Sequence, residues 1–94
     1  GEVLSKLEAN LPEIRERFFV QTIGIFGSVS RGEDRPDSDV DVLVTWVPGM
    51  ARMNIMMGLI WYLEELFSRK IDLVSTDGIS PYLKPYVMPD VIWC

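Results

Sequence analysis

The chain has 94 residues, 48% of them hydrophobic, so we expect one compact domain that spans residues 1–94. Fourteen acidic residues against nine basic ones give a formal net charge of −5, which disfavours a nucleic-acid partner because such proteins usually carry a basic face. An acidic chain can still bind a polyphosphate if a divalent cation neutralises both sides.

Cysteine and histidine usage excludes several kinds of site. The one cysteine, Cys94, cannot form an internal disulfide, and the chain has no histidine for a zinc site or a Ser-His or Cys-His nucleophile pair. The N-terminus does not have the pattern of a signal peptide, and the longest apolar run, residues 55–63, is far shorter than the roughly 20 residues of a membrane span. We therefore expect a cytoplasmic protein with no membrane partner.

The first part of the chain predicts a helical segment followed by a strand. Apolar residues recur at three- and four-residue spacing from Leu4 to Phe18, which indicates an amphipathic helix. Pro12 falls inside this pattern, so the helix either restarts near residues 10–12 or kinks there. Residues 21–26 are rich in β-branched and aromatic residues and predict a buried strand that ends at Gly27.

The rest of the chain alternates strands with helices. A short helical turn is expected from Ser28 and a loop around Pro36, followed by a strand at residues 39–46, a long helix at 54–69 and a strand at 70–75. The segment 76–89 is rich in turn residues, with room for one helical turn, and the last five residues predict a terminal strand. This order predicts an α/β (α+β) fold with a small mixed β-sheet and helices packed mainly on one face.

Alternation along the predicted strands brings acidic residues to one face. Asp39 and Asp41 share a face of their strand, opposite the valines that suit a core. On the third strand, Asp72 is expected to point away from the core. If the two strands are neighbours, the three carboxylates converge on one open surface.

Three carboxylates close together repel one another, and a hard divalent cation removes that repulsion. Mg²⁺ prefers oxygen ligands, usually a few carboxylates together with phosphate and water. Two such ions about 3.5–4 Å apart form the site used for in-line displacement at phosphorus.

The residues between the first two strands suit phosphate binding. Gly27 allows a sharp turn and a close approach to its backbone, and Ser28 could cap the next helix and hydrogen-bond a phosphate oxygen. Gly32 is expected to permit the turn that ends this short helix. Arg31 has two open interpretations, as a contact to a triphosphate or as a structural ion-pair partner.

Competing motifs fit less well. Asp37, Asp39 and Asp41 imitate the first ligands of a calcium loop, but Val42 and Pro48 stand where that loop needs glycine and glutamate. The chain has neither a G-x-x-x-x-G-K-[ST] phosphate loop nor a G-x-G-x-x-G pattern. An isolated D-x-D pattern is most often a solvated loop, so the argument depends on the combination of these residues at matching strand ends.

That combination resembles a known family. Residues 26–44, "FGSVSRGEDRPDSDVDVLV", are similar to the signature of the minimal nucleotidyltransferases of the DNA polymerase β-like superfamily, in which G-S and D-x-D are separated by ten residues. Gly27, Ser28, Asp39 and Asp41 match this pattern, and "KIDLVS" supplies Asp72 where the family has a third carboxylate. The resemblance extends from about Phe19 to the end of the chain.

The resemblance implies a DNA polymerase β-like nucleotidyltransferase fold and a defined chemistry. Asp39, Asp41 and Asp72 would hold two Mg²⁺ ions, while Gly27 and Ser28 would bind the β- and γ-phosphates of a nucleoside triphosphate, with ATP as the expected donor. Minimal members are commonly antitoxins encoded beside HEPN-domain toxins, where they resemble adenylyltransferases that place AMP on a tyrosine of the toxin. The expected partner is therefore a HEPN-type toxin.

A non-catalytic alternative remains open. A small chain could neutralise a partner protein by occlusion alone, through part of the wide apolar helix. The residues that could dock a partner or a second copy of the chain are Met53, Met56, Met57, Trp61 and Tyr62, although most of them suit a core equally well.

Overall fold

The computed structural model describes residues 2–33, 35 and 37–94, and its framework is a four-stranded sheet in the order β3-β2-β1-β4. The strands are β1 (Val20–Phe26), β2 (Val40–Trp46), β3 (Ile71–Ser75) and β4 (Ile92–Trp93). β1 pairs antiparallel with β2 and with β4, whereas β2 and β3 run parallel. The sheet is therefore mixed, as predicted.

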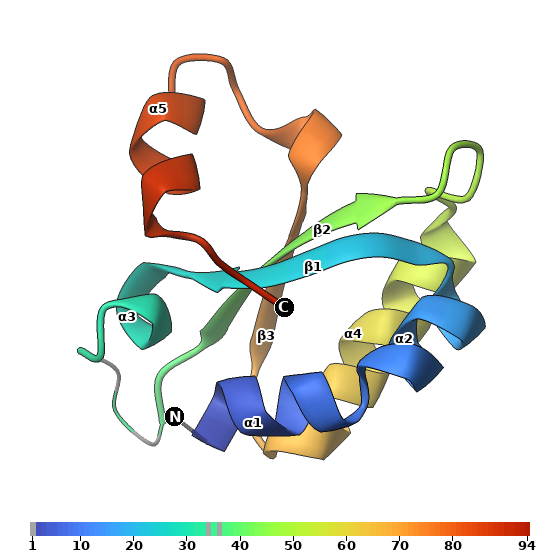
Figure 1. Cartoon of the computed structure of the whole chain (residues 1–94), viewed down its shortest axis with the longest axis horizontal. Coiled ribbons are helices and arrows are strands. Elements are labelled where there is room, and N and C mark those ends of the chain that lie inside the picture. Colours follow the sequence, from blue (N-terminus) through green and yellow to red (C-terminus); the bar gives the residue numbers. More distant parts are fainter. Residues whose placement is uncertain (1, 34, 36) are drawn as a thin grey trace.

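Helices cover one face of this sheet (Figure 1). The helices are α1 (Glu2–Ala9), α2 (Leu11–Phe18), α3 (Gly27–Ser30), α4 (Met53–Phe67) and α5 (Lys84–Val87), with 3-10 turns η1 (Thr76–Gly78) and η2 (Met88–Asp90). Residues of α1, α2 and α4 pack against β1, β2 and β3 in one hydrophobic cluster. The predicted fold class is confirmed.

The N-terminal helical segment is two helices rather than one kinked helix. α1 ends at Ala9, and α2 begins at Leu11 with Pro12 in its first turn, where the missing N–H of proline removes no helical hydrogen bond. Asn10 lies at the break, and its side-chain amide donates a hydrogen bond to the Lys6 carbonyl oxygen at 2.8 Å.

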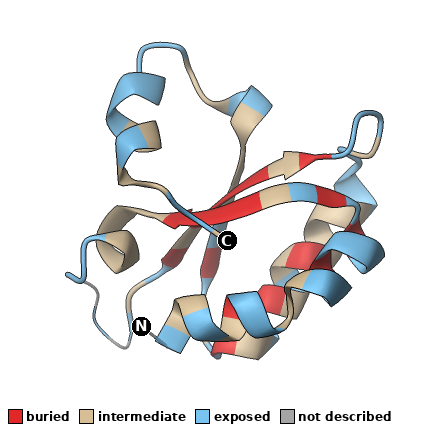
Figure 2. Cartoon of the chain, in the orientation of Figure 1, coloured by how far each residue is buried: buried red, intermediate tan, exposed pale blue. Residues whose placement is uncertain are grey.

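The core lies between the helices and the valine face of β2. Val40, Val42 and Val44 are fully buried, and the cluster that surrounds them includes Leu59 and Leu63 of α4 (Figure 2). Because side chains alternate along a strand, this burial fixes the odd-numbered residues of β2 on the opposite face. The strand periodicity predicted from the sequence is thus the one that the fold uses.

The exposed side of α4 carries two large apolar side chains. Met53 is 72% exposed and Trp61 is 63% exposed, whereas Met56 and Tyr62 pack partly against the core. The expected docking surface is therefore narrower than the sequence pattern indicated. Among the described residues, no helix combines the length and apolar character needed to cross a membrane.

Residues 76–91, here called the C-terminal arm, connect β3 to β4. Because these strands form opposite edges of the sheet, the arm passes from one edge to the other, on the side away from α1, α2 and α4 (Figure 1). It contains η1, α5 and η2 where the sequence predicted a single helical turn, and most of its surface is exposed (Figure 2). The predicted terminal strand is present as β4.

The end of the arm is seated on Gly24 of β1. A Cβ atom at this position would lie 2.6 Å from Val91 Cγ1 and 3.0 Å from both the Ile92 carbonyl oxygen and Trp93 Cε3. Gly24 pairs directly with Trp93 in the sheet. The absence of a side chain at residue 24 therefore allows β4 and the end of the arm to approach the sheet closely.

We predict that Gly24→Ala lowers the free energy of unfolding by about 1–3 kcal/mol, because the added methyl group overlaps Val91 and the β4 backbone. Gly78→Ala is the matched control, since a Cβ there meets no atom within 4 Å and should change the stability by no more than about 0.5 kcal/mol. Urea unfolding followed by circular dichroism measures both. Equal stability of the two variants would show that β4 is not seated as described.

Candidate active site

Asp41 and Asp72 lie side by side on neighbouring parallel strands. The register pairs Asp41 of β2 with Asp72 of β3, on the sheet face opposite the buried valines. The negative charge of Asp72 acts on the carboxyl group of Asp41 across this pair of strands. The neighbouring strands anticipated from the sequence thus bring two of the three acidic residues side by side.

The surroundings of Asp41 disfavour its charged form. Partial burial raises the pKa of Asp41, and the negative charges of Asp72 and Asp39 raise it further. The positive charge of Arg31 acts in the opposite direction. These effects show that Asp39, Asp72 and Arg31 all act electrostatically on one carboxyl group.

Asp39 differs from the other two acidic residues. It lies just before β2, and its side chain is exposed. Within the described part of the chain, no group of three or more acidic, cysteine or histidine side chains is close enough to hold a metal ion as the side chains stand. Asp41 and Asp72 therefore lie side by side on adjacent strands, whereas Asp39 precedes β2 and acts on Asp41 through its charge.

Gly27 links this acidic pair to the turn after β1. Its φ is +72°, a left-handed conformation that favours glycine, and a Cβ atom there would overlap the carboxylate of Asp41. Phe26, the residue before it, pairs with Asp41 in the sheet. The backbone of Gly27 thus lies directly against the acidic pair, and a side chain at this position would fill the intervening space.

The prediction that Ser28 caps the short helix is wrong. α3 already begins at Gly27, immediately after β1, and no side chain caps its first turn. Ser28 is instead the second residue of α3, and its carbonyl oxygen accepts a hydrogen bond from the Glu33 N–H at 2.9 Å. Gly32 has a φ of +70° in the turn after this helix, as predicted.

Arg31 makes two ion pairs. Its Nε lies 3.2 Å from Glu33 Oε2, and its Nη1 lies 3.2 Å from Asp90 Oδ2 in the C-terminal arm. The structural role considered for Arg31 is therefore present. Its charge also acts on Asp41, so the ion pairs hold it beside the acidic residues.

Arg69 holds the loop that leads into β2, a role that the sequence did not reveal. Its Nε donates to the Ser38 carbonyl oxygen at 2.9 Å, and its Nη2 donates to the Arg35 carbonyl oxygen at 3.0 Å. The expected loop proline, Pro36, lies outside the described residues. An arginine next to a strand gives no periodic signal, so only the structure identifies this anchor for the segment before Asp39.

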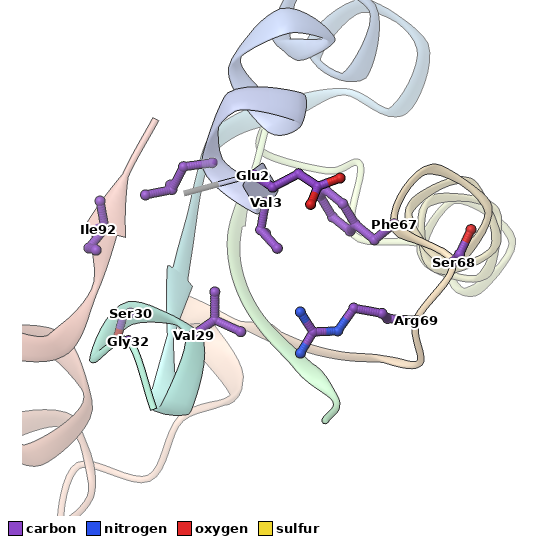
Figure 3. A pocket seen from close by; sticks show the side chains of 10 residues that line it. Glu2, Val3, Val29, Ser30, Gly32, Phe67, Ser68, Arg69 and Ile92 are labelled. Carbon is purple, nitrogen blue, oxygen red and sulfur yellow. The ribbon is translucent and has the colours of Figure 1, made fainter. Parts of the chain in front are cut away.

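The cavity in Figure 3 is separate from these acidic residues. It has a volume of about 690 Å³ and lies between α1, α3, β4 and the C-terminal end of α4. Val3, Val29 and Arg69 point toward one another across it (Figure 3). None of the six candidate site residues lines this cavity, although Val29 and Ser30 of α3 do.

Comparisons with known proteins agree with this geometry. The family model described as a nucleotidyltransferase domain matches residues 6–94. The chain is 38% identical over 94 residues to the protein adenylyltransferase MntA of Thermococcus cleftensis, a match that covers 98% of this chain and 92% of the relative.

Solved structures give the same result. A structure described as a "putative minimal nucleotidyltransferase" superposes with a TM-score of 0.77 and 34% identity, covering 95% of this chain and 93% of that one. A toxin-antitoxin structure with AMP-PNP shares the fold, with a TM-score of 0.74 and 23% identity over 92% of this chain and 70% of the other. Family model, sequence relatives and fold agree with the resemblance seen in the G-S and D-x-D residues, and the chain belongs to the minimal nucleotidyltransferases of the nucleotidyltransferase domain family.

Proposed function

We propose that this nucleotidyltransferase moves AMP from ATP to a hydroxyl group of a partner protein and releases pyrophosphate. The observation that carries the proposal is the pairing of Asp41 with Asp72 on neighbouring strands, with the Asp41 carboxylate directly beside the backbone of Gly27. This arrangement puts oxygen ligands for a cation next to a turn that phosphate can approach. The name of the Thermococcus cleftensis relative, a protein adenylyltransferase, supports AMP as the group and protein as the acceptor.

The donor atoms at this site fit Mg²⁺. Asp39, Asp41 and Asp72 supply only hard oxygen ligands. Partial burial raises the pKa of Asp41, and so do the negative charges of Asp72 and Asp39, which a cation would neutralise. We propose that these three side chains hold the metal, with two ions as the family resemblance implies. When bound, Mg²⁺ would neutralise the triphosphate and lower the pKa of the acceptor hydroxyl.

The protein's own groups have separate roles in this proposal. Gly27 and Ser28 contact the β- and γ-phosphates, and Arg31 adds positive charge to the same group. The acceptor oxygen attacks the α-phosphorus, a new P–O bond forms, and the bond to the pyrophosphate oxygen breaks. Asp72 accepts the proton that the acceptor hydroxyl loses, so positioning and charge stabilisation supply most of the acceleration.

The proposed partner is a HEPN-type toxin. Two of the solved structures that share the fold are described as a toxin-antitoxin complex and as a tri-AMPylated HEPN toxin bound to an MNT antitoxin. On this chain, the exposed side chains of Met53 and Trp61 on α4 offer an apolar contact surface. This partner gives the transferred AMP a protein acceptor.

Asp39→Ala with Asp41→Ala should reduce AMP transfer at least about 100-fold, because charge stabilisation at such a site is worth that much. Labelled ATP, Mg²⁺ and the protein encoded by the neighbouring gene are incubated together, and label on that protein is counted. Asp77→Ala, an exposed acidic residue of the arm, is the matched control and should transfer AMP like the wild type. Circular dichroism confirms that each variant is folded.

Two outcomes would contradict this proposal. Equal transfer by the double variant would remove Asp39 and Asp41 from the chemistry. If no label transfers at all and the folded double variant still protects cells from the toxin, the protein acts by occlusion alone.

Magnesium removal with EDTA should stop transfer in the wild type, and transfer that continues would contradict the role of the metal.

Asp41 should also lower the stability of the protein when no metal or nucleotide is bound. Partial burial and the nearby negative charges raise the pKa of Asp41 in the native state, so the native state loses stability as pH rises and Asp41 ionises. Functional sites often keep such unfavourable groups because ligand binding relieves the strain. Stability and ligand binding should therefore respond to this residue in opposite directions.

We predict that Asp41→Asn raises the melting temperature of the metal-free protein by a few degrees, since it removes the charge and keeps the shape of the side chain. Addition of Mg²⁺ and ATP should raise the melting temperature of the wild type but not that of the variant. Calorimetry at pH 7 measures both effects, with Asp77→Asn as the control. A lower melting temperature for Asp41→Asn would contradict the repulsion described above.

A further inference from the structure

The C-terminal arm ends beside the turn that carries Gly27. β4 pairs with β1 through Gly24 with Trp93 and Ile25 with Ile92. Asp90 is the last residue of η2, two positions before β4, and its carboxylate pairs with Arg31 just after α3. The next residue, Val91, packs closely against Gly24 of β1, the strand that leads directly into α3.

The ion pairs of Arg31 leave one side of its guanidinium group open. Glu33 occupies Nε and Asp90 occupies Nη1, while Nη2 has no hydrogen-bond partner among the residues that the structure describes. Arginine presents its donors in a rigid planar fork, so two fixed contacts also fix the direction of the third nitrogen. The charge of this group already acts on Asp41.

We propose that Asp90 is a positioning residue that holds Arg31 in place for the phosphates of the incoming nucleotide. The inference rests on the proposed function, in which Arg31 contacts the triphosphate. Asp90 itself touches no phosphate in this proposal. It acts through Arg31 and thereby makes the C-terminal arm part of the nucleotide site.

Stability alone does not explain the Arg31–Asp90 pair. The side chains are 46% and 41% exposed, and ion pairs with such exposure contribute little to folding because water and salt screen them. The pair nevertheless joins residues 59 positions apart in the sequence. An arginine side chain loses much conformational freedom when it binds phosphate, and a partner that orders it beforehand reduces that loss.

Calorimetric titration with Mg²⁺-pyrophosphate and, separately, with AMP tests the inference without any acceptor protein. We expect Arg31→Ala and Asp90→Ala each to weaken pyrophosphate binding about three- to tenfold, the range expected when an ordered side chain is lost. AMP binding should change less than twofold because AMP lacks the phosphates that Arg31 meets. Asp77→Ala, on the same arm and without an ion pair to another described residue, is the control and should bind both ligands like the wild type.

A double variant separates positioning from a general structural effect. Arg31→Ala combined with Asp90→Ala should bind pyrophosphate no more weakly than Arg31→Ala alone, since Asp90 acts only through the arginine. Asp90→Glu should recover part of the affinity. If Asp90→Ala does not fold, Asp90→Asn keeps the size of the side chain and removes its charge, and the same weakening is expected.

The failures are distinguishable. If Arg31→Ala weakens pyrophosphate binding and Asp90→Ala does not, the positioning role is wrong and the proposed function stands. If neither variant differs from the wild type, Arg31 is not a phosphate contact, which overturns the inference but leaves the carboxylate site in place. If the wild type binds neither Mg²⁺-pyrophosphate nor Mg²⁺-ATP, both proposals are wrong.

Discussion

The partly buried carboxyl group of Asp41, with the negative charge of Asp72 beside it, is the constraint that the rest of the structure has to offset. The parallel pairing of β2 with β3 sets these residues at the same level of one sheet face. On the opposite face, Val40, Val42 and Val44 are fully buried against the helices, and each contributes roughly 1.5 kcal/mol or more. Burial of these valines therefore stabilises the fold and offsets the unfavourable charge of Asp41 on the other face of β2.

The end of β1 brings the turn at Gly27 next to this acidic pair. β1 ends at Phe26, opposite Asp41, and the next residue turns with a positive φ that glycine adopts without strain. The turn can lie against Asp41 only because Gly27 has no side chain. The pairing of β1 with β2 thus places the backbone of Gly27 against Asp41.

Much of this arrangement could be predicted from local patterns. The alternation of valine and aspartate in residues 39–44 predicted both the core face and the acidic face of β2, because strand periodicity depends only on the sequence nearby. The start of α3 was misjudged because a serine after a glycine is typical of a cap, while the strand here continues directly into the helix. Resemblance to a family supplied the functional interpretation of residues that pattern alone left ambiguous.

Contacts between distant segments could not be predicted in this way. Asp90 meets Arg31 because the arm returns to the sheet edge beside β1, and no periodicity in residues 76–91 indicates that return. Arg69 holds the loop before Asp39 through backbone carbonyl groups, which every residue possesses and no sequence pattern marks. Sequence patterns therefore predicted which charged residues gather near Asp41, but not the contacts that hold Arg31 and the segment before Asp39.

The register of β2 determines both which residues form the core and which carboxyl groups lie on the opposite face. A slip of one residue in β2 would turn Asp41 toward the helices and a valine toward Asp72, because adjacent side chains of a strand point to opposite faces. Burial of a carboxylate among Leu59 and Leu63 would be strongly unfavourable, so the hydrophobic core excludes that slip. The packing that stabilises this small protein thereby also specifies that Asp41 and Asp72 lie on the sheet face opposite the core.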